Sequence, residues 1–470
     1  MKLVIAAIAI LSIFGISALN WRNSVKAVFF ILVIEGALRK WVLPQASDTI
    51  YFLKDLVLLG AYLQYYVFST RRFSIQNRPI SILIIFATIW CVLQVFNPSL
   101  GSPLVGLFGL RGYIFYIPLM WMLPTLFRSE QDLHKFLRSH LLLVIPVGLL
   151  GIAQFFSPAT SPINVYAPSQ LKEVATFGVA GATQIVRVTG TFSYIDGYAV
   201  YLLICFGLLI SLLSLYQPPF WKWISIFELI LVTVNSCMTG SRSVVFALLL
   251  FFVSFITVKG FTQPDKNVSL LGKFLLPTIC IALVSSIWFK PAIDAFLLRT
   301  NSNQDVSARI TTTFSQPFEF IQYKGLDGYG TGATQPGSQA MRRSLNLPDG
   351  ATIPTYFEEE PGRIVLELGP IGFFLWYGLR LSLLIALLRV FCQLKKPFLR
   401  QLALTALLIQ TIGIYDQLVT QPTFLAYYWF LSGFIFLLPQ LESIENWHRE
   451  QQLLQQHNVS SAYFPDSPYQ

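Results

Sequence analysis

The sequence predicts an all-α membrane protein: a polytopic transmembrane helical bundle of about 12–13 spans, with a large outer loop containing short amphipathic helices. Three observations support this. The 470 residues are 54% hydrophobic and only 12% charged, with a mean hydropathy of +0.60, whereas soluble domains carry roughly 25% charged residues. Apolar stretches long enough to cross a bilayer recur along the chain. Lys and Arg gather in alternate short loops between these stretches.

About thirteen stretches are predicted to be spans. They cover residues 3–19, 25–38, 50–68, 80–96, 104–127, 139–156, 195–216, 223–239, 243–258, 273–290, 364–390, 400–416 and 423–440. The first twenty residues also have features of a signal peptide, with Lys2 before an apolar stretch, but a second span follows almost at once. We expect residues 1–440 to form one transmembrane domain and residues 441–470 a polar, partly disordered cytoplasmic tail.

The short loops predict the orientation, because cytoplasmic loops carry an excess of Lys and Arg. Four loops are rich in these residues, namely those with Arg71, Arg72 and Arg78, with Lys135 and Arg138, with Lys259, Lys266 and Lys273, and with Arg389, Lys395, Lys396 and Arg400. This alternation accounts for the net charge of +10, so we expect no nucleic-acid partner. The five cysteines fall in or beside apolar runs and show no metal-ligand spacing.

Two predicted outer segments are long, at about 157–194 and 291–363, and loops of this length are usually functional or disordered. Within the second, apolar residues recur at helical intervals over 307–324. This pattern predicts a short amphipathic helix that lies on the membrane surface or caps a cavity. The alternative is a tethering loop without a direct role.

Arg111 interrupts an apolar run that otherwise predicts a membrane helix. A charge inside a bilayer costs ~2.5–3.5 kcal/mol on insertion scales, so it usually faces a cavity and a partner. Several other cations lie on the same outer side, where topology gives no reason for them. The cations predicted to bind a substrate pyrophosphate are Arg39, Lys40, Arg111, Arg187, Arg242, Arg309 and Arg363.

Arginine suits this role because its planar guanidinium grips phosphate oxygens in pairs. Glycines beside Arg111, Arg187 and Arg242 permit close approach of the backbone. Helix N-termini predicted near residues 195 and 243 would add their positive dipole ends. For Arg39 and Lys40 the alternative is ordinary snorkelling at the membrane interface.

Acidic residues gather on the same side. Glu359 and Glu360, before the eleventh span, and Glu367, just inside it, are the predicted catalytic residues, because a carboxylate at a dry surface can act as a general base on a hydroxyl. For Glu367 the alternative is an ion pair that holds the bundle together. All four histidines fall on the predicted cytoplasmic side, and no Walker loop, dinucleotide fingerprint or zinc pattern occurs. We therefore expect neither a metal nor a cofactor.

Four parts of the chain, in this order, resemble the O-antigen ligase/polymerase superfamily of bacterial envelope enzymes. They are Arg187-Val-Thr-Gly-Thr-Phe, Thr239-Gly-Ser-Arg-Ser, the long outer loop before the last few spans, and Glu367-Leu-Gly-Pro-Ile-Gly, which closes that loop. The likeness covers about 185–375, and the N-terminal third only by topology. Such proteins are membrane glycosyltransferases of the C type.

The resemblance implies an enzyme acting on polyprenyl-pyrophosphate-linked glycans at the outer face of the bacterial inner membrane, with Arg187 and Arg242 gripping the donor pyrophosphate. Its implied partners are the lipid-linked oligosaccharide, membrane lipids, a flippase and a chain-length regulator. The ligase branch has a histidine shortly before the Glu-x-Gly segment, but residues 358–363 contain none. This departure favours an O-antigen or exopolysaccharide polymerase. Ligase-type transfer to a lipid or protein acceptor, and transport of an anionic lipid or solute, are the alternatives.

Overall fold

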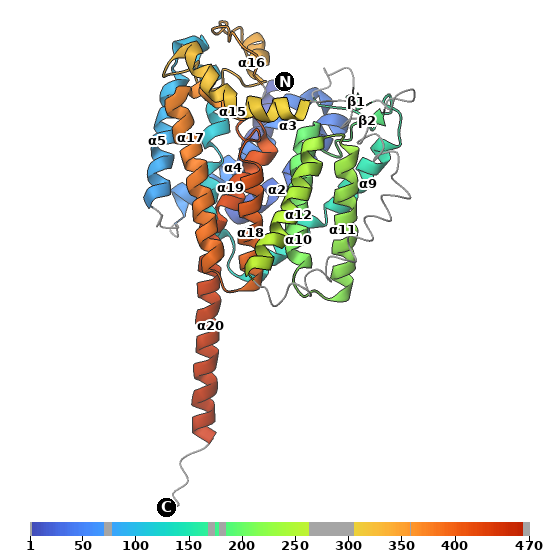
Figure 1. Cartoon of the computed structure of the whole chain (residues 1–470), viewed down its shortest axis with the longest axis vertical. Helices are drawn as coiled ribbons and strands as arrows, with labels where there is room; N and C mark the ends of the chain where they lie inside the picture. Colours follow the sequence, from blue (N-terminus) through green and yellow to red (C-terminus); the bar gives the residue numbers. More distant parts are fainter. Residues whose placement is uncertain are drawn as a thin grey trace, which may run out of the picture.

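The computed structural model describes residues 2–69, 78–167, 174–177, 185–262, 305–357 and 359–463. It is about 77% helical, which confirms the all-α prediction. Most of the helices stand side by side in one bundle (Figure 1). The predicted span at 273–290 lies outside the described residues.

The first half of the chain contributes short and long helices that end before the predicted loop at 157–194. They are α1 (Lys2–Leu19), α2 (Trp21–Ala37), η1 (Leu38–Val42), η2 (Pro44–Ala46), α3 (Ser47–Tyr51), α4 (Leu53–Tyr62), η3 (Leu63–Phe68), α5 (Arg78–Val95), η4 (Pro98–Leu100), α6 (Pro103–Ile114), α7 (Ile117–Leu126), α8 (Glu130–Leu141) and α9 (Val144–Phe155). Local chemistry sets several boundaries. Ser129 caps α8 by accepting a hydrogen bond from the backbone N–H of Asp132. Pro103 opens α6, where no N–H is needed.

The second half begins with a two-residue antiparallel ladder and continues as helices. The elements are β1 (Thr176–Phe177), β2 (Ile185–Val186), α10 (Ile195–Leu213), α11 (Pro219–Met238), α12 (Arg242–Thr262), α15 (Asp305–Lys324), α16 (Ser338–Leu345), α17 (Glu360–Gln393), α18 (Pro397–Ile412), α19 (Pro422–Ser432) and α20 (Phe434–Tyr463). The sequence did not predict the ladder. The helix predicted at 307–324 corresponds to α15.

Seven helices in the described part are long and apolar enough to cross a membrane. This supports a multi-pass membrane protein. Five other predicted spans fall on described residues and coincide with α1, α2, α4, α5 and α18. These helices are not among the seven, because they are shorter than a membrane-crossing helix or carry charged residues. In the apolar 18-residue window of each candidate span, 89% of the residues are buried for Pro422–Gln452 and only 28% for Arg242–Thr262. Helix α19 is therefore central and α12 peripheral.

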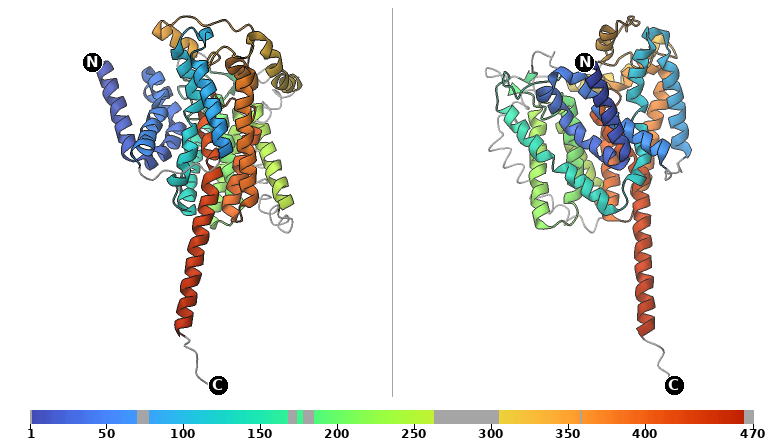
Figure 2. Two further views of the ribbon diagram at one scale, coloured as in Figure 1. Left: turned by 90° about the vertical axis from the view of Figure 1, so that its left-hand side faces the viewer. Right: turned by 180° about the vertical axis from the view of Figure 1, so that it is seen from behind.

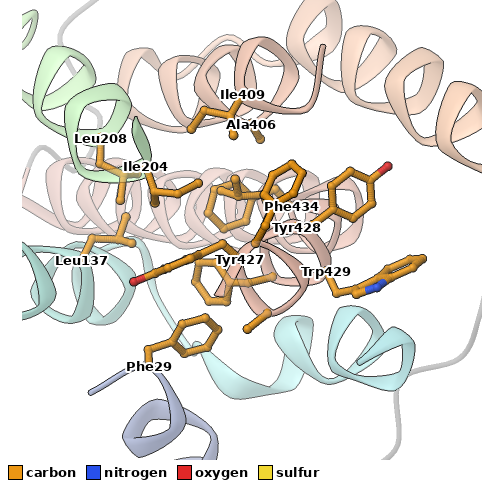
Figure 3. Packing of buried hydrophobic residues seen from close by; sticks show 14 of the residues in the cluster. Phe29, Leu137, Ile204, Leu208, Ala406, Ile409, Tyr427, Tyr428, Trp429 and Phe434 are labelled. Atoms are coloured by element: carbon orange, nitrogen blue, oxygen red, sulfur yellow. The ribbon is translucent and has the colours of Figure 1, made fainter. Parts of the chain in front are cut away.

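Aromatic side chains of α19 fill the centre of the bundle. Tyr427, Tyr428 and Trp429 are all buried. Figure 3 shows residues of four other helices around them, namely Phe29, Leu137, Ile204 and Ile409. This core fixes the relative positions of α2, α8, α10 and α18, and residues at or beyond the ends of α2, α10 and α18 belong to the candidate site.

Helix α17 bends back on itself at Gly369, where φ is +66° and ψ is −179°. As a result, Nη1 of Arg380 lies 2.9 Å from Oε1 of Glu360. A straight helix would hold residues twenty positions apart at a separation of about 30 Å. The first arm of α17 therefore packs against the second.

The two ends of the bundle differ. α3, α15 and the β1–β2 ladder lie at one end, and α20 projects from the other as a single helix (Figures 1 and 2). The sequence predicted a polar, partly disordered tail from residue 441. The structure describes α20 as far as Tyr463, and the partly disordered tail stays a prediction.

Candidate functional site

Arg187 opens a segment that lies across the end of the bundle. Its backbone N–H donates to the carbonyl oxygen of Ala175 at 2.9 Å, and its own carbonyl oxygen accepts from the Tyr166 hydroxyl at 3.0 Å. Its Nε donates to the carbonyl oxygen of Thr239 at 2.9 Å. These bonds fix the backbone and one edge of the guanidinium, and both Nη groups make no hydrogen bond to a described residue.

Thr239 belongs to the turn that joins α11 to α12. Gly240 has a φ of +61°, a left-handed conformation that costs glycine little. The backbone N–H of Ser241 donates to Thr239 Oγ1 at 3.1 Å and closes the turn. Arg242 is the first residue of α12, at the positive end of the helix dipole. Its Nη1 is buried without a hydrogen-bond partner in the described part of the chain.

Arg187 and Arg242 are thus attached to one turn. Neither forms an ion pair with a carboxylate of the described residues. Two guanidinium groups with unused donors, beside a glycine-containing turn and a helix N-terminus, provide the chemistry of a phosphate-binding site.

Lys40 lies in the π-helical turn η1, which directly follows α2. Its side chain contacts the segment that Arg187 opens. Its Nζ donates to Thr189 Oγ1 and to the carbonyl oxygen of Gly190, both at 2.8 Å. The side chain is 5% exposed, and burial lowers the pKa of the Lys40 ammonium to about 7, because the charge loses its hydration. These contacts show that Lys40 holds the segment in place. Its direct contact with a pyrophosphate stays a prediction.

Arg39, Lys54 and Arg111 surround the ring of Tyr51. Their charged groups lie 5.0, 4.6 and 4.9 Å from the ring centroid, respectively. Glu35 pairs with two of these cations, because its carboxylate lies 2.7 Å from Lys54 Nζ and 3.7 Å from Arg39 Nη1. Arg39 is therefore part of a network that joins η1, α3, α4 and α6, in which three cations pair with the two carboxylates of Glu35 and Asp55.

Arg111 is paired with a carboxylate. Its Nε lies 2.7 Å and its Nη2 2.5 Å from Asp55 Oδ2, and the Tyr116 hydroxyl donates to Asp55 Oδ1 at 2.5 Å. No contact among the described residues joins Arg111 to Arg187 or Arg242. Arg111 therefore lies in a contact network with Asp55, Tyr51 and Tyr116, and its predicted contact with a pyrophosphate stays a prediction.

Glu360 is buried within the protein, with 2% of its surface exposed. It accepts hydrogen bonds from Arg380 Nη1 at 2.9 Å and from the backbone N–H of Val419 at 3.0 Å. Arg380 Nη2 also donates to the carbonyl oxygen of Gly413 at 2.6 Å. The pair ties the first arm of α17 to the loop between α18 and α19. These contacts give Glu360 a structural role, and its predicted catalytic role stays a prediction.

Glu367 is equally enclosed, at 1% exposed. It accepts from the Tyr113 hydroxyl at 2.7 Å and from the backbone N–H and Oγ1 of Thr334, both at 2.8 Å. Its partners in the described residues are neutral donors, and they clamp α6 and the 325–337 segment onto α17. Arg363 Nη1 donates to the carbonyl oxygen of Thr334 at 3.4 Å, and its guanidinium lies 5.2 Å from the ring centroid of Phe357.

Asp416 lies in the loop after α18, which ends at Ile412. Its side chain is exposed. The pKa of Asp416 is raised to about 6, mainly because the surrounding protein removes part of the hydration of its carboxylate. The positive charge of Arg380 lowers this pKa, whereas the negative charges of Glu359 and Asp196 raise it. Asp416 thus shares its surroundings with two other carboxylates, from the N-cap of α17 and the first turn of α10. A group that titrates near 6 suits a general base at neutral pH.

Asp196 connects the acidic and basic parts of this end of the bundle. Both Asp196 and Arg187 act electrostatically on the Tyr166 hydroxyl, which donates to the Arg187 carbonyl oxygen. Asp196, in the first turn of α10, thus influences both Tyr166, which contacts Arg187, and Asp416. Arg309 lies in α15, and its side chain is outside the described part.

The described residues include no group of three or more His, Cys, Asp or Glu side chains placed to hold a metal ion. A cavity of about 470 Å³ lies at the other end of the bundle, where α17 ends beside α20. Its lining includes Leu394, Glu442 and Trp447. Because it is remote from the cations, we do not assign it to the candidate site.

No protein-family model matches this chain, and no curated protein matches it. The assignment of the site therefore depends on the contacts above. Sequence reasoning missed three residues of these contact networks. Gln154, a lone amide within an apolar stretch, was an available signal, and so was the charged pair Lys54-Asp55 within a predicted span.

Proposed function

We propose that this chain is a membrane glycosyltransferase that polymerises polyprenyl-pyrophosphate-linked glycan repeat units at the outer face of the bacterial inner membrane. The observation that carries the proposal is the pair Arg187 and Arg242 on one turn, with unused donors and no carboxylate partner in the described residues. A lipid diphosphate presents the paired oxygens that guanidinium groups bind best.

The chemistry follows from where charge develops. An acceptor sugar hydroxyl attacks the anomeric carbon of the donor, the bond from that carbon to the diphosphate breaks, and the hydroxyl proton passes to a carboxylate. Negative charge then builds up on the departing polyprenyl diphosphate, where fixed positive groups stabilise the transition state. Arg187 and Arg242 supply those groups, and the lipid diphosphate is itself the activated leaving group.

Asp416 is the best candidate for the carboxylate that accepts the proton. It is exposed and its pKa is raised to about 6, whereas Glu360 and Glu367 are buried and fully engaged by protein donors. Glu359 lies beside Asp416 and influences its charge, so it keeps a supporting role in the proposal.

Ligase-type transfer to a lipid or protein acceptor would use the same donor site and differ only in the acceptor. The absence of histidine from residues 305–363 favours polymerisation, given the resemblance described above. Transport is less well supported, because Arg187 and Arg242 are attached to one turn at one end of the bundle rather than placed along a path through it.

The experiment compares surface polysaccharide from cells that carry Arg187→Ala, Arg242→Ala or the matched control Arg343→Ala, an exposed arginine of α16. We expect both site variants to give single repeat units in place of a polymer ladder at normal protein abundance, and the control to give a full ladder. Lysine at either site should rescue poorly, because it lacks the guanidinium fork. Normal ladders from both alanine variants would refute the proposal. Full-length glycan that lacks its anchor would indicate a ligase.

A further inference from the structure

We infer that Gln154 is a positioning residue for the diphosphate site, holding the Thr189-Gly190 turn so that Arg187 is presented to the lipid diphosphate. The inference rests on the proposed function. Gln154 lies at the end of α9 and is 1% exposed. A buried amide is costly unless it is hydrogen-bonded, and the bonds that Gln154 makes all concern the loops at this end of the bundle.

Both ends of the Gln154 amide are occupied. Its Oε1 accepts from the backbone N–H groups of Thr189 at 3.3 Å and Gly190 at 2.8 Å. Its Nε2 donates to the carbonyl oxygens of Gly190 at 3.2 Å and Ile163 at 3.0 Å. One side chain therefore satisfies the donor and the acceptor of Gly190, in a turn that has no sheet or helix to do so.

Lys40 holds the same turn from α2, because its Nζ donates to the Gly190 carbonyl oxygen that Gln154 also binds. The fit is close. A Cβ at Gly190 would lie 3.0 Å from Val147 and 3.2 Å from Tyr198, and the glycine has a φ of +52°. The turn is thus fixed between α2 and α9 by one ammonium and one amide.

Arg187 precedes this turn by two residues. Its bond to Thr239 holds only Nε, so the direction of the guanidinium depends on where the backbone enters the turn. Loss of Gln154 leaves two backbone N–H groups and two carbonyl oxygens without this partner. The turn can then shift, and misplacing a binding group by ~1 Å is enough to cost much of its effect.

The test measures binding of farnesyl diphosphate to the purified full-length protein in nanodiscs. The variants are Arg187→Ala, Gln154→Leu, their double variant, and Gln154→Glu, which keeps the acceptor oxygen and should fold if the leucine variant does not. Gln410→Leu is the matched control, because Gln410 is also fully buried and donates to Tyr428 and Ser432 in another part of the core. The Tm of each variant is measured as a check on folding.

We expect Gln154→Leu and Arg187→Ala each to weaken the Kd by about tenfold or more, Gln154→Glu to be intermediate, and the double variant to match Arg187→Ala within about twofold, since coupled residues are non-additive. The control should lower the Tm and leave the Kd unchanged. Unchanged Kd values in both Gln154 variants, or additive losses in the double variant, would overturn the inference while Arg187→Ala still loses binding. Unchanged binding by Arg187→Ala would overturn the proposed site itself.

Discussion

The Nε of Arg187 donates to the carbonyl oxygen of Thr239 at 2.9 Å across 52 residues of sequence. Arg242 follows Thr239 by three residues at the start of α12. Two short motifs that are separate in the sequence are therefore parts of one structure. This bond is the basis for treating the two arginines as a single anion-binding unit.

Replacing Asp416 with asparagine tests the proposed base. We expect Asp416→Asn to lower kcat by about 10²- to 10⁴-fold, the usual contribution of general base catalysis, with no change in the Kd for farnesyl diphosphate. Asp349→Asn, at an exposed loop position, is the control and should keep full activity. A kcat within twofold of the wild type, measured on a lipid-linked donor, would remove Asp416 from the mechanism.

The pH dependence of the wild-type rate provides a second test of Asp416. Its raised pKa of about 6 means that the carboxylate, the form that accepts a proton, is lost as the pH falls below that value. We expect kcat to rise with pH through about 6 and then level off. A rate that is flat over that range, or one that keeps the same inflection in Asp416→Asn, would assign the titration to another group.

Breaking the buried Glu360–Arg380 pair should destabilise the protein rather than stop chemistry directly. Leaving one buried charge without its partner typically costs about 3–5 kcal/mol, so Glu360→Gln and Arg380→Met should each lower the Tm. The double variant Glu360→Leu/Arg380→Met should recover part of the loss. If Glu360→Gln kept the wild-type Tm and lost all activity, a catalytic role for Glu360 would be restored.

Arg111 is expected to depend on Asp55 in the same way. Asp55→Asn and Arg111→Met should each lower the Tm, since each removes half of a largely buried ion pair. Neither should weaken binding of farnesyl diphosphate by more than about twofold in protein that remains folded. A loss of binding by Arg111→Met as large as that of Arg187→Ala would return Arg111 to the diphosphate site.

The sequence predicted the helices because a span leaves a strong signal, about 20 apolar residues in a row. The signal was weaker where charged residues lie within the helix. α4 carries Lys54 and Asp55, and these charges, which looked like exceptions within a predicted span, are the partners of Glu35 and Arg111. A charged pair in an apolar stretch could have been used to predict such a network, although not its members.

The bend of α17 was not predicted, and neither was the pairing of Glu360, although Gly369-Pro370 within the apolar run is a sequence signal for a helix break. Glu360 and Arg380 are twenty residues apart in one apolar run, and only the left-handed backbone at Gly369 brings them together. The sequence prediction placed Asp416 at the end of the span 400–416, because a hydropathy pattern does not show at which residue a helix ends. The structure ends α18 at Ile412 and leaves Asp416 in the loop.

The central claim is that Arg187 and Arg242 hold a lipid diphosphate as a glycan is transferred from it. The most direct test gives the purified protein in nanodiscs a polyprenyl-diphosphate-linked repeat unit and sizes the products by mass spectrometry. We predict longer lipid-linked glycans and one released polyprenyl diphosphate for each new bond, with no product from folded Arg187→Ala or Arg242→Ala. Unchanged substrate with the wild-type protein, or identical products from both variants, would contradict it.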